Sequence, residues 1–133
     1  MKIFKESMFQ PDGSIVQLFD ILQKLERNKL MWSVLYFEGI GRAPNLLSME
    51  EFEREIEIGE LGFTMDWAEL FAFSQGLEQT FDCVVVGYKR DQVFDKNRIL
   101  NGEDEGCEVI IDAFDSEEWI VKDQGNDNIL DVV

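Results

Sequence analysis

The side chains in this sequence that could perform chemistry are almost all carboxylates. The 133 residues include 28 Asp and Glu, two Cys and no His. The lack of histidine excludes Ser-His and Cys-His nucleophile systems, His-ligated zinc or iron and the usual general base. Two cysteines cannot complete an all-thiolate zinc site, which needs four. We therefore expect no catalytic residue, no metal site and no cofactor.

Three weaker patterns could still support chemistry. Carboxylate pairs hydrolyse glycosides, but the sequence does not place any two of its acids across a cleft. Residues 123–128 resemble a calcium loop, yet Gly125 falls at the third position instead of the sixth. Gly39 and Gly41 lack the third glycine and the Lys-Ser/Thr of a nucleotide-binding loop. An enzyme that uses only carboxylates remains the least favoured alternative.

The net charge of −16 is concentrated in two segments. Residues 48–82 carry ten acidic residues and one basic residue, and residues 103–133 carry eleven acidic residues and one basic residue. Residues 1–47 have a net charge of +1, and residues 83–102 have +2. A net charge of about 2–8 in magnitude would keep a small domain soluble. The surplus indicates either a field that attracts a basic partner or a generic acidic surface.

Loops and turns in the second half should present most of the partner-binding acids. We predict one acidic patch formed by residues 103–105 of the long loop together with the last hairpin, with Trp119 as an aromatic anchor. A second candidate patch lies at residues 50–55. The whole set is Glu103, Asp104, Glu105, Asp112, Asp115, Glu117, Glu118, Trp119, Glu50, Glu51, Glu53 and Glu55. A core position is the alternative for Trp119, and a solvated helix face is the alternative for residues 50–55.

Apolar spacing predicts the elements that must position these residues. Strands are expected at 2–5, 31–37, 81–88, 107–114 and 118–122. The first helix is expected to start at Ser14, to include Leu25 and to end near Asn28. Two further helices are expected to start at Ser48 and Thr64, and Asp127 could cap a terminal turn of helix. The helix from Ser48 is expected to pass into an extended piece, because residues 55–58 alternate like a strand. Residues 39–45 and 89–105 are expected to be loops.

This order of elements predicts one α+β domain over residues 1–133. We expect a largely antiparallel sheet with two or three helices packed on one face, so that the exposed face could be the working surface. The predicted core residues lie on the apolar sides of the best-defined elements. They are Phe19, Leu22, Leu35, Phe37, Leu70, Val84, Val86 and Ile110.

In its small size, its acidity and its lack of a catalytic motif, the chain resembles bacterial toxin-immunity proteins. The first residues show no secretory signal, and no apolar run approaches the ~18 residues of a membrane span. We therefore expect a cytoplasmic protein without membrane contacts. The resemblance implies tight one-to-one binding of a basic toxin domain, such as a nuclease, by a monomer or weak dimer.

Two other classes of binding protein stay open. One is an inhibitor that mimics nucleic acid, with carboxylates spaced like phosphates along one face. The other is a small intracellular adaptor or a phage accessory protein. Direct binding of nucleic acid is disfavoured, because phosphate contacts dominate such affinity and an acidic field repels phosphate.

Overall fold

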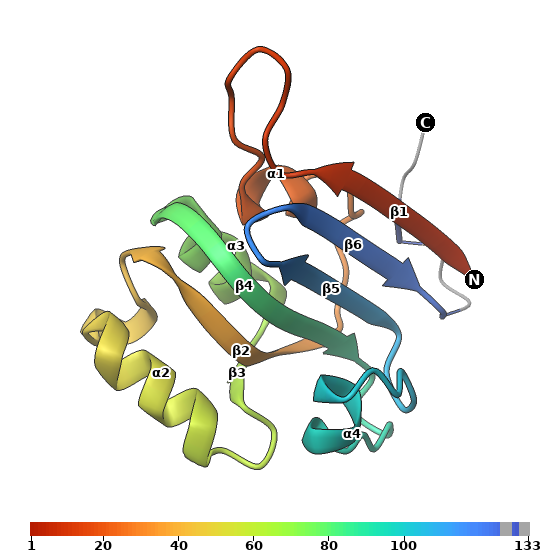
Figure 1. The fold of residues 1–133 in the computed structure, drawn as a ribbon. Coiled ribbons are helices and arrows are strands. Elements are labelled where there is room, and N and C mark those ends of the chain that lie inside the picture. The colour runs from red at the N-terminus through yellow and green to blue at the C-terminus, as the bar shows by residue number, and fades with distance from the viewer. Residues whose placement is uncertain (126–128, 131–133) are drawn as a thin grey trace.

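The computed structural model of the chain describes residues 1–125 and 129–130. Six strands form one antiparallel sheet in the order β1-β6-β5-β4-β2-β3 (Figure 1). The strands are β1 (Lys2–Ser7), β2 (Met31–Gly41), β3 (Phe63–Met65), β4 (Leu77–Tyr88), β5 (Val109–Phe114) and β6 (Glu118–Asp123). The helices are α1 (Leu18–Leu22), α2 (Met49–Ile58), α3 (Trp67–Gln75) and α4 (Lys96–Leu100), with a 3-10 turn, η1, at Pro44–Leu46. The predicted α+β fold is confirmed.

The sheet carries a hydrophobic core on each face. The larger one, here called the main core, joins the sheet to α1, α2 and α3 and includes Trp32, Phe52, Leu70 and Trp119. The smaller one, here called the second core, lies under α4 and consists of Leu35, Val86, Tyr88, Phe94, Ile99, Cys107 and Ile110. In Figure 1, α4 stands in front of the sheet, and α1 and α3 lie behind it. Three helices therefore cover one face, and α4 covers part of the other.

Helix α1 begins later and is shorter than the sequence predicts. Ser14 does not cap it, because its backbone N–H and its hydroxyl both donate to the Asp12 carboxylate, at 2.9 and 2.6 Å. Such a local turn competes with the helix for the same groups. The helix starts after Gln17, whose backbone N–H donates to Asp20. Leu25, predicted to lie within it, instead forms an isolated β-bridge with Leu130.

The predicted start of helix α2 is confirmed, but the prediction that it passes into an extended piece is wrong. The capping box is present, since Ser48 accepts from the Glu51 backbone and the Glu51 side chain accepts from the Ser48 backbone. The helix then continues to Ile58, through the segment predicted to be extended. Phe52 and Ile56 are both buried, four residues apart. Burial of this one helical face outweighs the local strand-like alternation.

Three other predicted boundaries also change. Thr64 lies in β3, and the cap of α3 is Asp66, whose carboxylate accepts from the Glu69 backbone at 2.7 Å. The predicted loop at 89–105 contains α4. Strands β2 and β4 are longer than predicted, because they pair with each other as far as Gly41 and Leu77 through several bulges. The terminal turn that Asp127 could cap lies outside the described residues.

Most of the predicted core residues are buried. Leu22, Leu35, Phe37, Leu70, Val86 and Ile110 are buried, whereas Phe19 and Val84 are half-buried. Phe19 packs edge-on against Phe71 at the surface side of the main core. Within the described part of the chain, no helix combines the length and the apolar character that a membrane span requires.

A lysine from α4 holds the end of α2. The Lys96 ammonium donates to the backbone carbonyls of Ile56, Glu57 and Gly59, at 2.6, 3.1 and 3.1 Å. Carbonyls in the last turn of a helix have no intrahelical partner, and a cation is favourable at this negative end of the helix dipole. Lys96 therefore connects a helix of the main core to the helix that covers the second core.

We expect Lys96→Met to lower the free energy of unfolding by about 1–2 kcal/mol, because three carbonyls lose a charged donor. Urea unfolding followed by circular dichroism measures this change. Arg98→Met is the matched control, since Arg98 is an exposed cation on the same helix and its loss should change stability by less than about 0.5 kcal/mol. An equal loss in both variants would mean that the carbonyl contacts contribute nothing.

Candidate functional site

The part of the sheet that α4 leaves uncovered is the candidate site, here called the open face. Directly paired residues of antiparallel strands point to the same side, so the register places two rows of side chains there. The outer row lies nearer the β5–β6 turn. The inner row is Tyr36, Val84, Asp112, Ile120 and Lys5, and the outer row is Glu38, Asp82, Phe114, Glu118 and Ser7.

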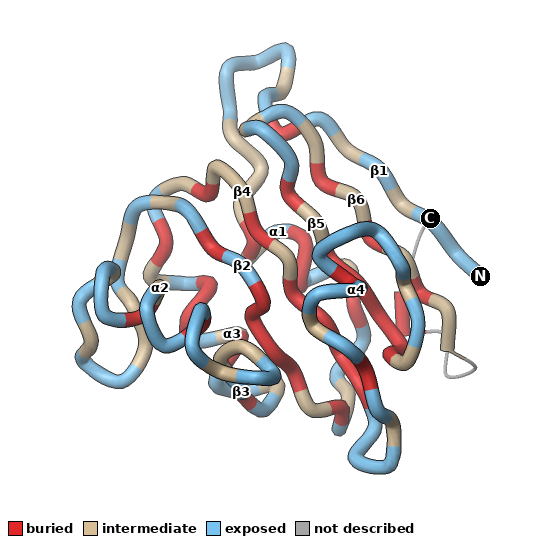
Figure 2. Tube along the Cα trace, turned by 60° about the horizontal axis from the view of Figure 1, so that its bottom comes forward, coloured by how far each residue is buried: buried red, intermediate tan, exposed pale blue. Residues whose placement is uncertain are grey.

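Strand alternation and one bulge determine which side chains reach the open face. On β6, Trp119 and Val121 enter the main core, so Glu118 and Ile120 point to the opposite side. On β2, the register shifts between Val34 and Tyr36. This bulge places Leu35 in the second core and leaves Tyr36 on the same side of the sheet. In Figure 2 buried and more exposed residues alternate along β6 and along the parts of β2, β4 and β5 away from α4, whereas these three strands are continuously buried where cores lie on both faces.

Two aromatic side chains on the open face are accessible to a partner. Tyr36 is 45% exposed and Phe114 is 64% exposed. The half-buried Val84 pairs with Tyr36, and the half-buried Ile120 is a diagonal neighbour of Phe114 across β5 and β6. Single exposed apolar residues are common on protein surfaces, but a contiguous group bordered by charges typically marks an interaction site.

Carboxylates surround this apolar group. The Tyr36 hydroxyl donates to Glu38 at 3.3 Å. Partial burial raises the pKa of Tyr36, and the negative charges of Glu38, Asp82 and Glu53 raise it further. Tyr36 therefore stays neutral at physiological pH and lies within the field of three carboxylates. Glu53 belongs to α2, so this helix extends the acidic border of the open face.

Asp112 is the most perturbed carboxyl group of the open face. Burial raises its pKa to about 6, the carboxylate of Asp104 adds to the rise, and the ammonium of Lys122 opposes it. Lys122 is itself held by a hydrogen bond to Asp104, which raises the pKa of the lysine. Asp112 is thus a half-buried carboxylate whose nearest cation already binds another acid.

The structure brings only part of the predicted partner-binding set together. Asp112 and Glu118 lie on the open face, and Glu53 and Asp104 border it. The remaining predicted acids are exposed elsewhere: Glu103 and Glu105 after α4, Asp115 and Glu117 at the β5–β6 turn, and Glu50, Glu51 and Glu55 on α2.

Trp119 is a core residue, and the prediction that it anchors a partner from the surface is corrected. Its side chain is 0% exposed, and its indole N–H donates to the Val16 carbonyl at 2.9 Å. The aromatic residues of the open face are instead Tyr36 and Phe114, which sequence reasoning missed. The alternation of Tyr36 and Glu38 around the buried Phe37 could have identified Tyr36, and the alternation of Asp112 and Phe114 around the buried Ala113 could have identified Phe114.

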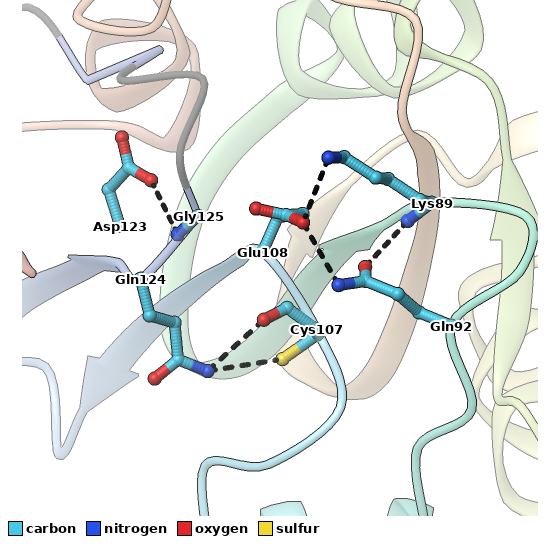
Figure 3. Close-up of polar contacts among 7 residues, drawn as sticks. All are labelled: Lys89, Gln92, Cys107, Glu108, Asp123, Gln124 and Gly125. Atoms are coloured by element: carbon cyan, nitrogen blue, oxygen red, sulfur yellow. Dashed lines mark hydrogen bonds and ion pairs between the residues drawn. The ribbon is translucent and has the colours of Figure 1, made fainter.

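A buried polar cluster holds the segment that covers the second core. Glu108 is 7% exposed, accepts a hydrogen bond from Gln92 at 2.9 Å and lies 3.5 Å from the Lys89 ammonium (Figure 3). Gln124, which follows β6, donates to the Cys107 carbonyl at 3.2 Å. These contacts attach both ends of the segment that contains α4, residues 89–108, to the end of the sheet remote from the β5–β6 turn. The α4 segment therefore stays clear of the open face.

The two cysteines are unreactive thiols. Both are free, with Cys83 in the main core and Cys107 in the second core, on opposite sides of the sheet. Burial raises the pKa of both thiols, that of Cys107 to about 11, so neither is a thiolate at neutral pH. Residues 1–125 and 129–130 contain no group of three or more His, Cys, Asp or Glu that could hold a metal ion.

Comparison of the chain with protein-family models, with curated proteins and with solved structures found no match. The function therefore has to be inferred from the geometry and charge of the open face. That surface offers exposed aromatic side chains beside carboxylates, on strands that are fixed within the sheet.

Proposed function

We propose that the chain is a non-catalytic acidic binding protein whose open face covers a basic protein partner. One observation carries the proposal: exposed Tyr36 and Phe114 lie in rows of side chains that also hold four carboxylates. Aromatic residues supply most of the energy in many interfaces, and the surrounding charges select the partner. Lys5 is the one basic residue in these two rows, so the complementary surface is basic.

Within this class, the observations best support an immunity protein that neutralises a basic toxin domain in the cytoplasm. The net charge of −16 would accelerate encounter with a basic domain and disfavour acidic ones. Lys and Arg of the toxin would pair with Glu38, Asp82 and Glu118, and an apolar group would pack on Tyr36 and Phe114. The backbone groups of these strands bond within the sheet, so binding would use side chains.

Association kinetics with a captured partner test this proposal. We expect Glu38→Lys with Glu118→Lys to slow association about ten-fold and to accelerate dissociation, because contacts in the interface are reversed. Association of the unchanged protein should also slow as salt rises, since the Debye length falls from ~10 Å at 0.1 M to ~3 Å at 1 M.

The matched control is Glu103→Lys with Glu105→Lys, which makes the same change in net charge on an exposed loop outside the open face. This pair should slow association only modestly and leave dissociation unchanged. A larger effect in the control would place the partner on the loop and contradict the proposed site. An acidic partner, or unchanged association in both variants, would contradict the proposed function.

A further inference from the structure

A groove of about 1100 Å³ lies on the main-core side of the molecule, between α3 and the segment that follows α1. Its apolar lining includes Trp67 and Phe71 of α3 and Met31 at the start of β2. Both α3 aromatic residues are half-buried, and Trp67 packs against Trp32 and Phe71 with ring centroids 5.5 and 5.9 Å apart. The groove thus has a rigid aromatic wall.

The charge of this groove is opposite to that of the whole chain. Arg27, Lys29 and Arg90 line it, with Asp66 as the acidic residue among its lining side chains. Asp66 is already used as the cap of α3. Three of the 12 basic residues therefore meet at one groove in a chain with 28 acidic residues. Such a local concentration of positive charge favours an acidic occupant.

Helix α3 carries few charged residues for a helix that lines an open groove. Glu69 is the one charged residue between Trp67 and Gln75, so the helix is apolar on nearly all sides. A helix of this composition is normally buried all round. Ala68 and Ala72 are nevertheless exposed in the groove. Their small side chains would allow another chain to approach the helix closely.

We propose that this groove binds an acidic peptide segment of a protein partner. Apolar side chains of the segment would contact Trp67 and Phe71, and its carboxylates would pair with Arg27, Lys29 and Arg90. The volume exceeds the range of roughly 300–1,000 Å³ that is usual for small-molecule pockets. The groove is independent of the open face, so the protein would carry two binding surfaces of opposite charge.

Two short synthetic peptides test the groove in the whole protein. They share their Leu, Phe and Trp positions and differ in having either Glu or Lys at all others. In ¹⁵N NMR spectra, the Glu peptide should shift the Trp67 indole signal and the amides of residues 27–31 and 66–75. Shifts by the Glu peptide confined to other surfaces would overturn the proposal. The Lys peptide should shift the open face, so its failure alone would count against the proposed function and not against the groove.

Two variants test whether the Glu peptide binds in the groove. Arg90→Glu should weaken binding of the Glu peptide about ten-fold, and Ala72→Glu should weaken it similarly at an exposed helix position. The matched control is Arg54→Glu on the exposed side of α2, which should change the affinity less than two-fold. Equal weakening by Arg90→Glu and Arg54→Glu would overturn the proposal, because only the overall charge would then matter.

Two further outcomes would also overturn it. A single-stranded DNA oligonucleotide that shifts the groove signals when the Glu peptide does not would make the occupant a nucleic acid. Groove signals that shift with protein concentration, without any peptide, would make it a second copy of this chain.

Discussion

Replacing Trp119 with Ala is expected to lower the free energy of unfolding by about 3–5 kcal/mol. The side chain is fully buried in the main core, so its removal leaves a large cavity between β6 and the helices. The substitution also removes the indole donor of the Val16 carbonyl. Guanidinium unfolding followed by far-ultraviolet circular dichroism measures the loss.

Phe114→Ala is the matched control for Trp119→Ala. Phe114 belongs to the same hairpin but is 64% exposed, so its loss should change stability by less than about 1 kcal/mol. The proposed function predicts that Phe114→Ala nevertheless weakens partner binding. If Trp119→Ala instead kept the stability of the unchanged protein and lost the partner, Trp119 would be a surface anchor and not a core residue.

Asp112→Asn is expected to raise the free energy of unfolding by about 1–3 kcal/mol at pH 8. Burial raises the pKa of Asp112 from 3.8 to about 6, and a tenfold change in an acid dissociation constant corresponds to about 1.4 kcal/mol. Ionisation of Asp112 therefore costs the folded state more than the unfolded state. A neutral amide of similar shape avoids this cost.

The dependence on pH follows from the direction in which the pKa of Asp112 is displaced. Above about pH 6 the carboxylate is ionised in both states, so the full penalty applies. Below pH 3.8 it is protonated in both states, so the advantage of the variant should vanish. Urea unfolding at about pH 8 and about pH 3.5 measures the difference, with the exposed Glu105→Gln as control. A constant difference between the variant and the unchanged protein at both pH values would contradict the raised pKa.

The same substitution separates stability from binding. If the open face covers a basic partner, Asp112→Asn should stabilise the free protein and weaken the complex, because a carboxylate is lost from the interface. Proteins commonly retain groups that reduce stability where function needs them. A variant that is more stable and binds equally well would place Asp112 outside the interface.

Local sequence patterns determined much of the fold. Alternation and β-branched residues identified the central strands and the β5–β6 hairpin, and the Ser48–Glu51 capping box identified the start of α2. These elements can be predicted from the sequence because their signals depend on residues within a few positions of one another. The same local reading failed in two places. Helix α2 continues through a strand-like segment because its apolar face is buried against distant parts of the chain. Helix α1 starts late because Asp12, only two residues from Ser14, accepts the hydrogen bonds that the predicted cap needed.

The sequence by itself also determined the acidity, the absence of histidine and the positions of the acids, but not which acids share a surface. Tertiary structure decided that, because α4 covers only part of one sheet face and the bulge in β2 leaves Tyr36 beside Val84. Trp119 and Glu118 are neighbours in sequence, yet one enters the main core and the other reaches the open face. Alternation predicts that they point to opposite sides, but the packing of helices on each side decides which of them is buried.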